Sequence, residues 1–130
     1  MQRFLQRFDN YNKAIENLFD TNEEYKKQSS KFMAMALIQA FEISFELAWK
    51  VQKDYLNYLG FDVNGPREVI KKSFNSEIIK NGDVWLDMLE ARNLTTHLYD
   101  EIRIKDIASE IVDLYINEFS LLKEFFESKV

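Results

Sequence analysis

The sequence predicts an all-α protein, an up-and-down bundle of four long helices with one additional short helix. Turn residues are scarce, with only 3 Gly and 1 Pro, whereas a sandwich or barrel of short strands needs many more of them. Apolar residues make up 46% of the chain and aromatic residues 15%, a composition that argues against disorder. The length of 130 residues suits a single domain that spans residues 1–130.

The first two helices are predicted over residues 3–27 and 31–59, where apolar side chains recur mostly at steps of three and four. Ser29 and Ser30 offer an N-terminal cap for the second helix, and Gly60 is a suitable C-terminal stop. Small residues on the second helix allow another helix to approach it closely; they are Ala34, Ala40, Ser44 and Ala48.

A turn at Asn64-Gly65 leads to a short helix predicted over residues 66–74, with a proline at its first position, where proline is favoured. A longer helix is predicted over residues 83–98, and its apolar side chains lie nearly all round it. The last helix is predicted over residues 101–128. Most connections between these helices are short, which favours the up-and-down arrangement.

The apolar stripes on the helices over residues 31–59 and 83–98 are too wide for a single bundle to cover. A helix that is apolar nearly all round is buried on more than one side. We therefore predict a homodimer with a two-fold axis, the commonest arrangement of soluble oligomers, with the 83–98 helix at or near the interface.

Composition excludes several kinds of site. The chain has no Cys and a single His, so it has no disulfide, no thiolate metal site and no two-histidine zinc site within one subunit, and we expect no metal or other cofactor.

The start of the chain lacks a continuous apolar stretch, and no run of about 18 consecutive apolar residues occurs. We therefore expect a cytoplasmic protein without a membrane contact. The net charge of −5 argues against non-specific coating of nucleic acid, while it allows a small phosphate site or a partner with a basic surface.

The stretch "RNLTTHLYDE", residues 92–101, ends an apolar helix with a polar cluster that includes the single histidine. At about 100° per residue, Asn93, Thr96 and His97 continue the face of the preceding leucines, and Arg92 flanks that face. Histidine can act as a general acid or base near neutral pH, and arginine holds a phosphate through two parallel hydrogen bonds. Two copies facing each other across a dimer axis would supply two such pairs. The alternative is an ordinary helix end, where the histidine interacts with free carbonyl groups.

Three segments carry a resemblance to a known family: "LIQAFEISFELAWKVQKDYL", "GPREVIKKSF" and "VWLDMLEARNLTTHLYDE". Together they resemble the nucleotidyltransferase substrate-binding protein family, a branch of the HEPN (higher eukaryotes and prokaryotes nucleotide-binding) superfamily that includes HepT-like toxins. The signature of that superfamily is an arginine, then four to six residues, then a histidine. Arg92 and His97 match it, and Tyr99 completes the extended form Arg-x4-His-x-Tyr. Asn93 fits the polar residue that commonly follows the arginine.

The resemblance implies a HEPN-like bundle that dimerises and forms a complex with a minimal nucleotidyltransferase encoded nearby. Many such proteins are toxins, metal-independent endoribonucleases that this partner silences. Arg92 would then hold the scissile phosphate, and His97 would act as general base or acid. Asn93 and Thr96 would orient these groups, and Tyr99 would accept AMP from the partner. The alternative is a non-catalytic subunit that binds a nucleotide or another substrate for the nucleotidyltransferase.

Other charged and aromatic residues leave two interpretations open. Glu42 and Glu46 either join Lys50 in an exposed ion-pair ladder, or one of them faces the Arg-His site. Trp49 and Trp85 are predicted in the core. The segment "PREVIKK" supplies a modest basic patch that is either solvated surface or a contact for RNA or a partner; its residues are Arg67, Lys71 and Lys72. The chain lacks a Gly-rich phosphate loop and the paired carboxylates of a nucleotidyltransferase, so we do not expect it to transfer nucleotides itself.

Overall fold

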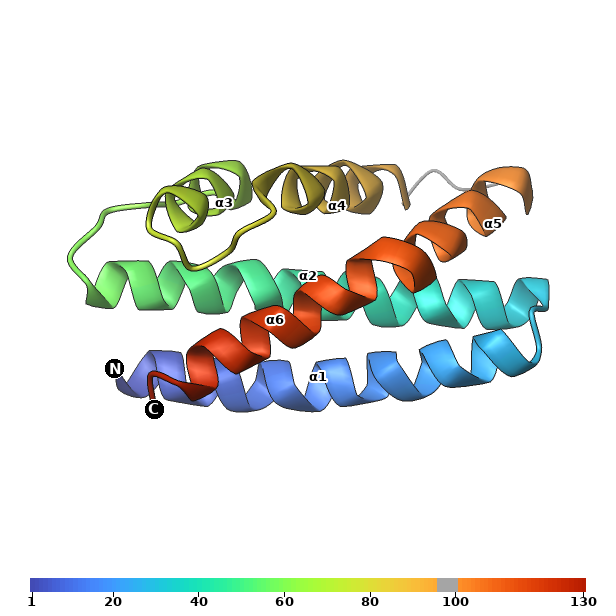
Figure 1. Cartoon of the computed structure of the whole chain (residues 1–130), viewed down its shortest axis with the longest axis horizontal. Helices are drawn as coiled ribbons and strands as arrows, with labels where there is room; N and C mark the ends of the chain where they lie inside the picture. Colours follow the sequence, from blue (N-terminus) through green and yellow to red (C-terminus); the bar gives the residue numbers. More distant parts are fainter. Residues whose placement is uncertain (96–100) are drawn as a thin grey trace.

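The computed structural model describes residues 1–95 and 101–130, and in these ranges every regular element is a helix (Figure 1). This confirms the predicted all-α fold. The elements are α1 (Gln2–Lys27), α2 (Lys31–Tyr58), α3 (Pro66–Asn75), α4 (Gly82–Thr95), α5 (Glu101–Glu110), the π-helical segment η1 (Ile111–Tyr115) and α6 (Ile116–Glu127).

The helices form an up-and-down bundle. α1 and α2 run antiparallel side by side, and α3 and α4 lie on the opposite side of α2 from α1 (Figure 1). The last helix is continuous through α5, η1 and α6 and crosses the bundle diagonally. Both termini lie at the same end of the molecule. The chain thus has the predicted arrangement, with α3 as the additional short helix.

Local sequence signals set the helix boundaries close to the predicted ones. The Oγ of Ser30 accepts a hydrogen bond from the backbone N–H of Met33 at 3.1 Å and caps α2. Gly60 follows the end of α2 with a φ of +100°, a backbone conformation that favours glycine. Pro66 is the first residue of α3. The second and third helices therefore begin at the predicted residues.

The core is rich in aromatic side chains that come from helices far apart in the sequence. Trp85 of α4 is fully buried, and its ring centre lies 5.8 Å from that of Phe119 of α6 in an edge-on arrangement. The hydroxyl of Tyr11 on α1 donates a hydrogen bond to the carbonyl oxygen of Phe119 at 2.7 Å. Burial raises the pKa of Tyr11 well above its usual value. Trp85 is therefore a core residue, as predicted, whereas Trp49 is only partly buried against the core.

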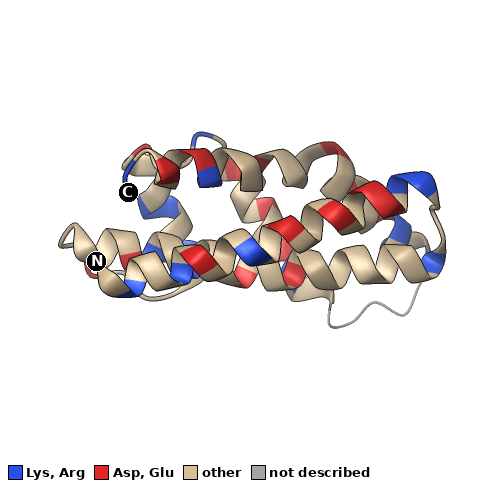
Figure 2. Cartoon of the chain, turned by 90° about the horizontal axis from the view of Figure 1, so that it is seen from below, with Lys and Arg blue, Asp and Glu red and all other residues tan. Residues whose placement is uncertain are grey.

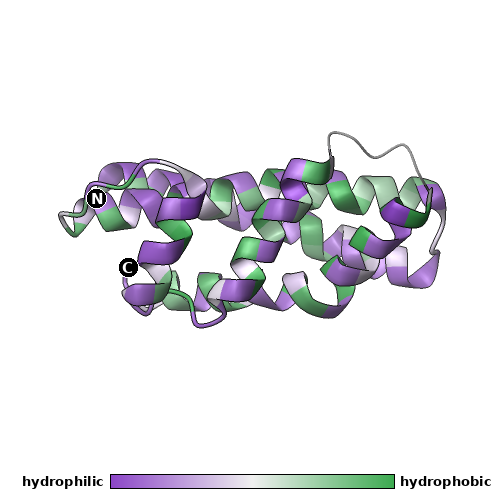
Figure 3. Ribbon diagram, turned by 90° about the horizontal axis from the view of Figure 1, so that it is seen from above, coloured by the Kyte–Doolittle hydropathy of each residue, from purple (hydrophilic) through white to green (hydrophobic). Residues whose placement is uncertain are grey.

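α2 is the most apolar long helix and lies between its neighbours in the bundle. By length and composition alone it is long and apolar enough to cross a membrane, although Glu42 and Glu46 interrupt its apolar run. The core helix of a bundle passes the same test, and 44% of this apolar stretch is buried inside the structure. Hydrophobic and hydrophilic residues are mixed around the helices (Figure 3), the pattern of amphipathic helices that each bury one side.

The last helix differs from its prediction in one respect. It is continuous over residues 101–127, but its central segment, Ile111–Tyr115, has π-helical hydrogen bonding. A π segment is a local widening of the helix that is often found at functional sites. Ile111 and Tyr115 are both buried, and a spacing of four residues between buried side chains is equally typical of an ordinary α-helix. The apolar pattern therefore cannot reveal the π segment.

Candidate functional site

The end of α4 brings one arginine over α2. Trp85, Met88 and Leu89 bury one side of α4 in the core. Arg92 follows Met88 by four residues and Leu89 by three, so it lies on the same side of the helix. The Arg92 side chain is 30% exposed. Its guanidinium therefore lies at the edge of the core, against α2, where neighbouring side chains can hold it.

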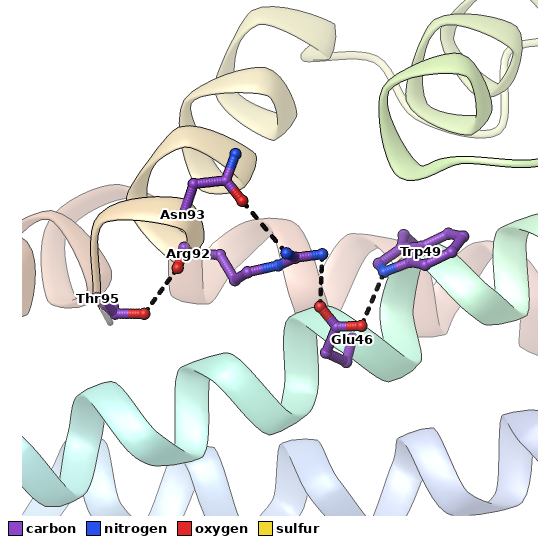
Figure 4. Close-up of polar contacts among 5 residues, drawn as sticks. All are labelled: Glu46, Trp49, Arg92, Asn93 and Thr95. Carbon is purple, nitrogen blue, oxygen red and sulfur yellow. Dashed lines mark hydrogen bonds and ion pairs between the residues drawn. The ribbon is translucent and has the colours of Figure 1, made fainter. Parts of the chain in front are cut away.

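Two side chains hold the guanidinium of Arg92 (Figure 4). Its Nη2 lies 2.7 Å from Oε1 of Glu46 on α2, and its Nη1 donates to Oδ1 of Asn93 at 3.2 Å. Glu46 is itself oriented, because its Oε2 accepts a hydrogen bond from the indole Nε1 of Trp49 at 3.2 Å. The hydroxyl of Thr95 donates to the carbonyl oxygen of Arg92 at 2.7 Å, in the last turn of α4. Together these contacts fix both the backbone and the side chain of Arg92.

The structure distinguishes between the two glutamates of α2. Glu46 faces Arg92, whereas Glu42, one turn earlier, forms no hydrogen bond or ion pair with any residue that the structure describes. Lys50 forms no ion pair with Glu46 within the same ranges, and its Nζ lies 6.0 Å from the centre of the Trp49 ring. The interpretation of these residues as an ion-pair ladder is therefore wrong. Glu46 is the carboxylate of α2 that faces the predicted site.

Trp49 is a residue of this site that the sequence does not predict. The apolar pattern places it in the core, and part of its ring does pack there, but its indole N–H is used to orient Glu46. Residues three apart on a helix are neighbours on its surface. That spacing between a glutamate and a tryptophan is the only signal that could have indicated this role.

The guanidinium of Arg92 retains donors for a ligand. An arginine has five N–H donors, and the contacts to Glu46 and Asn93 each use only one of its terminal nitrogens. Nε is buried and has no hydrogen-bond partner among residues 1–95 and 101–130. Because Nε is buried, it does not count as a donor for a ligand, and the donors that remain are the second N–H of Nη1 and of Nη2. A phosphate oxygen that reached this edge of the bundle would meet an arginine already fixed in position.

A groove of about 660 Å³ opens beside Arg92, between the start of α3 and the end of α4. Two further cations line it, Arg67 and Lys71, and neither forms an ion pair with a residue that the structure describes. The one carboxylate in the lining, Glu68, accepts a weak hydrogen bond from a backbone N–H at 3.4 Å. The complete lining is Gly65, Pro66, Arg67, Glu68, Lys71, Leu89, Arg92 and Asn93.

The local charge at this groove differs from the charge of the whole chain. The chain carries a net charge of −5, and acidic residues are interleaved with basic ones along the molecule (Figure 2). The groove, in contrast, has three cationic side chains and one carboxylate in its lining. Glu46 offsets the charge of Arg92. The other two cations of the lining, Arg67 and Lys71, form no ion pair with a residue that the structure describes. Two cations of the patch predicted from "PREVIKK", Arg67 and Lys71, therefore line the groove beside Arg92, whereas the third, Lys72, lies over the ring of Phe61.

The structure brings together two of the predicted site residues, Arg92 and Asn93. The other three, Thr96, His97 and Tyr99, lie outside the described residues. In the part of the chain that is described, no group of three or more His, Cys, Asp or Glu side chains could hold a metal ion. These features define the protein as a small helical bundle in which an arginine, paired with a glutamate, lies beside a groove lined by further cations.

The chain belongs to the family described as nucleotidyltransferase substrate binding protein like, whose model matches residues 6–128. The family that the three sequence segments resemble is thereby confirmed. The match extends over Glu46, Arg92 and the groove between α3 and α4, so the family assignment includes every residue of the site described above.

One relative is the probable ribonuclease HepT of Haemophilus influenzae, which is 26% identical over 92 residues. That match covers 67% of this chain and 63% of the relative, so the chain spans somewhat less than two thirds of that protein.

Two solved structures have the same fold. One, from Haemophilus influenzae, is described as the fold of a substrate binding domain of a nucleotidyltransferase; it has a TM-score of 0.81 at 21% identity and covers 90% of this chain and 96% of its own. The other, from Thermus thermophilus, has a TM-score of 0.76 at 24% identity and covers 92% of this chain and 97% of its own. At these identities the likeness shows a shared fold.

Proposed function

We propose that this chain is the HEPN component of a two-protein toxin–antitoxin module and acts as a metal-independent endoribonuclease in the cytoplasm. The observation that carries the proposal is the guanidinium of Arg92, held by Glu46 and Asn93 at the edge of a basic groove. Membership of the family and the likeness to a probable ribonuclease support it.

In this mechanism Arg92 binds the scissile phosphate and His97 transfers protons. The ribose 2′-oxygen attacks the phosphorus while a neutral imidazole takes its proton, and the bond from phosphorus to the 5′-oxygen breaks. The leaving 5′-oxygen takes a proton from an imidazolium, so the products are a 2′,3′-cyclic phosphate and a 5′-hydroxyl. The guanidinium stabilises the negative charge that develops on the phosphoryl oxygens, and Asn93 and Thr96 orient the reacting groups.

The second histidine would come from a second copy of the chain. α2 exposes a strip of large apolar side chains, Phe32 (79% exposed), Met35 (49%) and Ile43 (50%). At about 100° per residue these lie on the face of α2 that continues to Glu46. A second copy that covered the strip across a two-fold axis would bring its own site beside Arg92. This strip is a different set of residues from the apolar stripe that the sequence pattern predicts to be too wide, since Leu37, Phe41 and Phe45 of that stripe are buried within one bundle.

Sedimentation tests this assembly. The parent chain should sediment as a dimer at micromolar concentration, and Phe32→Glu combined with Ile43→Glu should give an inactive monomer. Leu121→Glu is the matched control, because Leu121 of α6 is similarly exposed, at 41%, outside the strip. A monomeric parent, or a double variant that is monomeric and fully active, would exclude a site shared between two copies.

The partner in this proposal is a minimal nucleotidyltransferase. The hydroxyl oxygen of Tyr99 attacks the α-phosphorus of ATP and loses its proton, and pyrophosphate leaves, so that AMP becomes attached to the tyrosine. The added bulk and negative charge, two residues after His97, would oppose the binding of an RNA phosphate. Tyr99→Phe should therefore cleave RNA almost as the parent does but escape silencing by the active partner and ATP. Full silencing of this variant would rule out control at Tyr99.

The decisive experiment is RNA cleavage by the purified chain in EDTA, together with growth after its expression alone. Arg92→Ala and His97→Ala should each abolish toxicity and lower cleavage, by a factor of about 100 to 10,000 for the histidine. Lys13→Ala is a suitable control, because Lys13 is exposed and pairs with Asp9 on the same helix. Circular dichroism should show that all of these variants fold.

A second function is a non-catalytic subunit that presents a nucleotide or another phosphate-bearing substrate to the nucleotidyltransferase. The description of the family as substrate binding and the ion pair between Arg92 and Glu46 favour it, because an arginine already paired with a carboxylate can hold a ligand without any proton transfer. Neither function requires a cofactor in this chain. If no RNA is cut and only the binding of mononucleotides depends on Arg92 and His97, the binding subunit is the correct function.

A further inference from the structure

A second cavity adjoins the groove beside Arg92. It measures about 600 Å³ and lies between the end of α3 and the start of α4. Lys71 lines both cavities, so the two are neighbours on the surface of α3. We call the two together the α3 groove; the side chains that matter for its chemistry are Arg67, Lys71, Phe74 and Lys80.

The α3 groove has four cations in its lining, including Arg92, against two carboxylates, Glu68 and Asp83, and three of the cations are available to a ligand. Arg67 and Lys71 are four residues apart on α3, slightly more than one turn or about 6 Å along the helix, and therefore lie on the same face. Lys80 lines the second cavity. All three side chains are exposed, and none forms an ion pair with residues 1–95 or 101–130. A row of such cations favours a ligand with several negative charges rather than one.

The second cavity also contains an exposed aromatic ring. Phe74 is 50% exposed, and Gly82 at the start of α4 supports its ring so closely that a Cβ at that position would lie 3.0 Å from Cδ1 of Phe74. Phe61 is exposed as well, but its ring is covered by Nζ of Lys72 at 3.9 Å. Phe74 is thus an open ring backed by the main chain of α4. Proteins bind single-stranded nucleic acid with this combination, in which bases stack on aromatic rings and cations follow the backbone.

We propose that the α3 groove binds the single-stranded RNA that extends from the scissile phosphate. The phosphates of the strand contact Arg67 and Lys71, and a base stacks on Phe74 close to Lys80. The identity of the ligand as RNA rests on the proposed function. The groove itself indicates the form of this RNA. It is a single strand of several nucleotides, because a base that is paired inside a duplex cannot stack on a side chain.

The test measures binding separately from cleavage. The ligand is a fluorescent single-stranded oligonucleotide of about eight 2′-O-methyl nucleotides, a length within the range that single-strand sites cover. It lacks the attacking 2′-hydroxyl, so its anisotropy reports binding by the full chain whether or not the chain is a ribonuclease. Phe74→Ala should weaken binding about five- to a hundredfold. Arg67→Ser with Lys71→Ser should lower the slope of log affinity against log salt by about 1.4, since each contact to a single-strand phosphate contributes about 0.7.

Matched controls exist for both changes. Phe61→Ala removes an exposed ring that Lys72 covers, and Lys13→Ser with Lys26→Ser removes the same amount of charge from α1. These variants should bind the oligonucleotide as the parent does. Phe74, Arg67 and Lys71 are all exposed, so their replacement should leave the melting temperature close to that of the parent.

The outcomes separate this inference from the proposed function. If the parent cuts no RNA but binds the oligonucleotide through Phe74, Arg67 and Lys71, the ribonuclease proposal fails and the RNA-binding groove stands. If RNA is cut and bound equally well by the α3 variants, the groove proposal is overturned. It is also overturned if those variants bind RNA as the parent does but no longer bind the nucleotidyltransferase, because the groove is then a protein-docking surface. A parent that neither binds nor cuts RNA overturns both.

Discussion

Replacing Glu46 by glutamine shows whether the ion pair between α2 and α4 positions the arginine of the site. The change keeps the size of the side chain and one acceptor oxygen but removes the charge. The pair is partly exposed, with 30% of the Arg92 side chain and 37% of the Glu46 side chain accessible, so its contribution to folding is that of a surface pair, about 0 to 1 kcal/mol. For a chain of 130 residues this corresponds to a loss of at most about 3 to 5 °C in Tm.

The effect of Glu46→Gln on cleavage should be larger than its effect on stability. Arg92 keeps its hydrogen bond to Asn93, but Nη2 loses the charged acceptor at 2.7 Å that orients the guanidinium. A misplacement of about 1 Å at a catalytic group can cost about a hundredfold in rate, so we expect kcat to fall by about ten- to a hundredfold. RNA should bind as tightly as before or more tightly, because a negative charge has been removed from beside the phosphate site.

Single-turnover experiments measure the rate of cleavage, oligonucleotide anisotropy measures RNA binding, and thermal melting measures the loss in Tm. Glu42→Gln is the matched control, since Glu42 lies one turn earlier on α2, undergoes the same chemical change and contacts no described partner. Cleavage by Glu46→Gln at the parental rate, or an equal fall in Glu42→Gln, would refute the role of the ion pair. A loss of more than about 10 °C in Tm would refute its description as a surface pair.

Three further predictions concern the indole of Trp49 and the hydroxyl of Tyr11. Trp49→Phe removes the indole N–H that orients Glu46 but keeps a ring in place, and it should lower cleavage about two- to tenfold in the same assay. Tyr11→Phe removes the buried hydrogen bond to the carbonyl oxygen of Phe119, and it should lower the free energy of unfolding by about 1 to 2 kcal/mol in urea titrations. Burial raises the pKa of Tyr11 in the folded chain above its unfolded value of about 10, so the folded state keeps the proton longer, and stability should be retained below about pH 10 and fall as pH rises above it. Alkaline unfolding curves should show that fall for the parent and a shallower one for Tyr11→Phe.

The helix pattern is predictable from sequence because its causes are local. The cap at Ser30, the glycine conformation at Gly60 and the proline at the start of α3 each involve residues within a few positions of one another. The apolar periodicity that buries Trp85 is likewise a property of one helix. The π segment Ile111–Tyr115 escapes prediction because its buried residues have the same spacing as those of an α-helix.

By itself the sequence determines that the chain is helical, where its second and third helices begin, which family it belongs to and that Arg92 and Asn93 lie in a polar cluster at a helix end. Only the tertiary structure decides that Glu46 rather than its neighbour one turn away faces Arg92, and that a basic, partly aromatic groove on α3 begins beside it. Both features depend on how α2, α3 and α4 are rotated against one another. That rotation is set by the packing of side chains from the whole core, and no single stretch of sequence contains it.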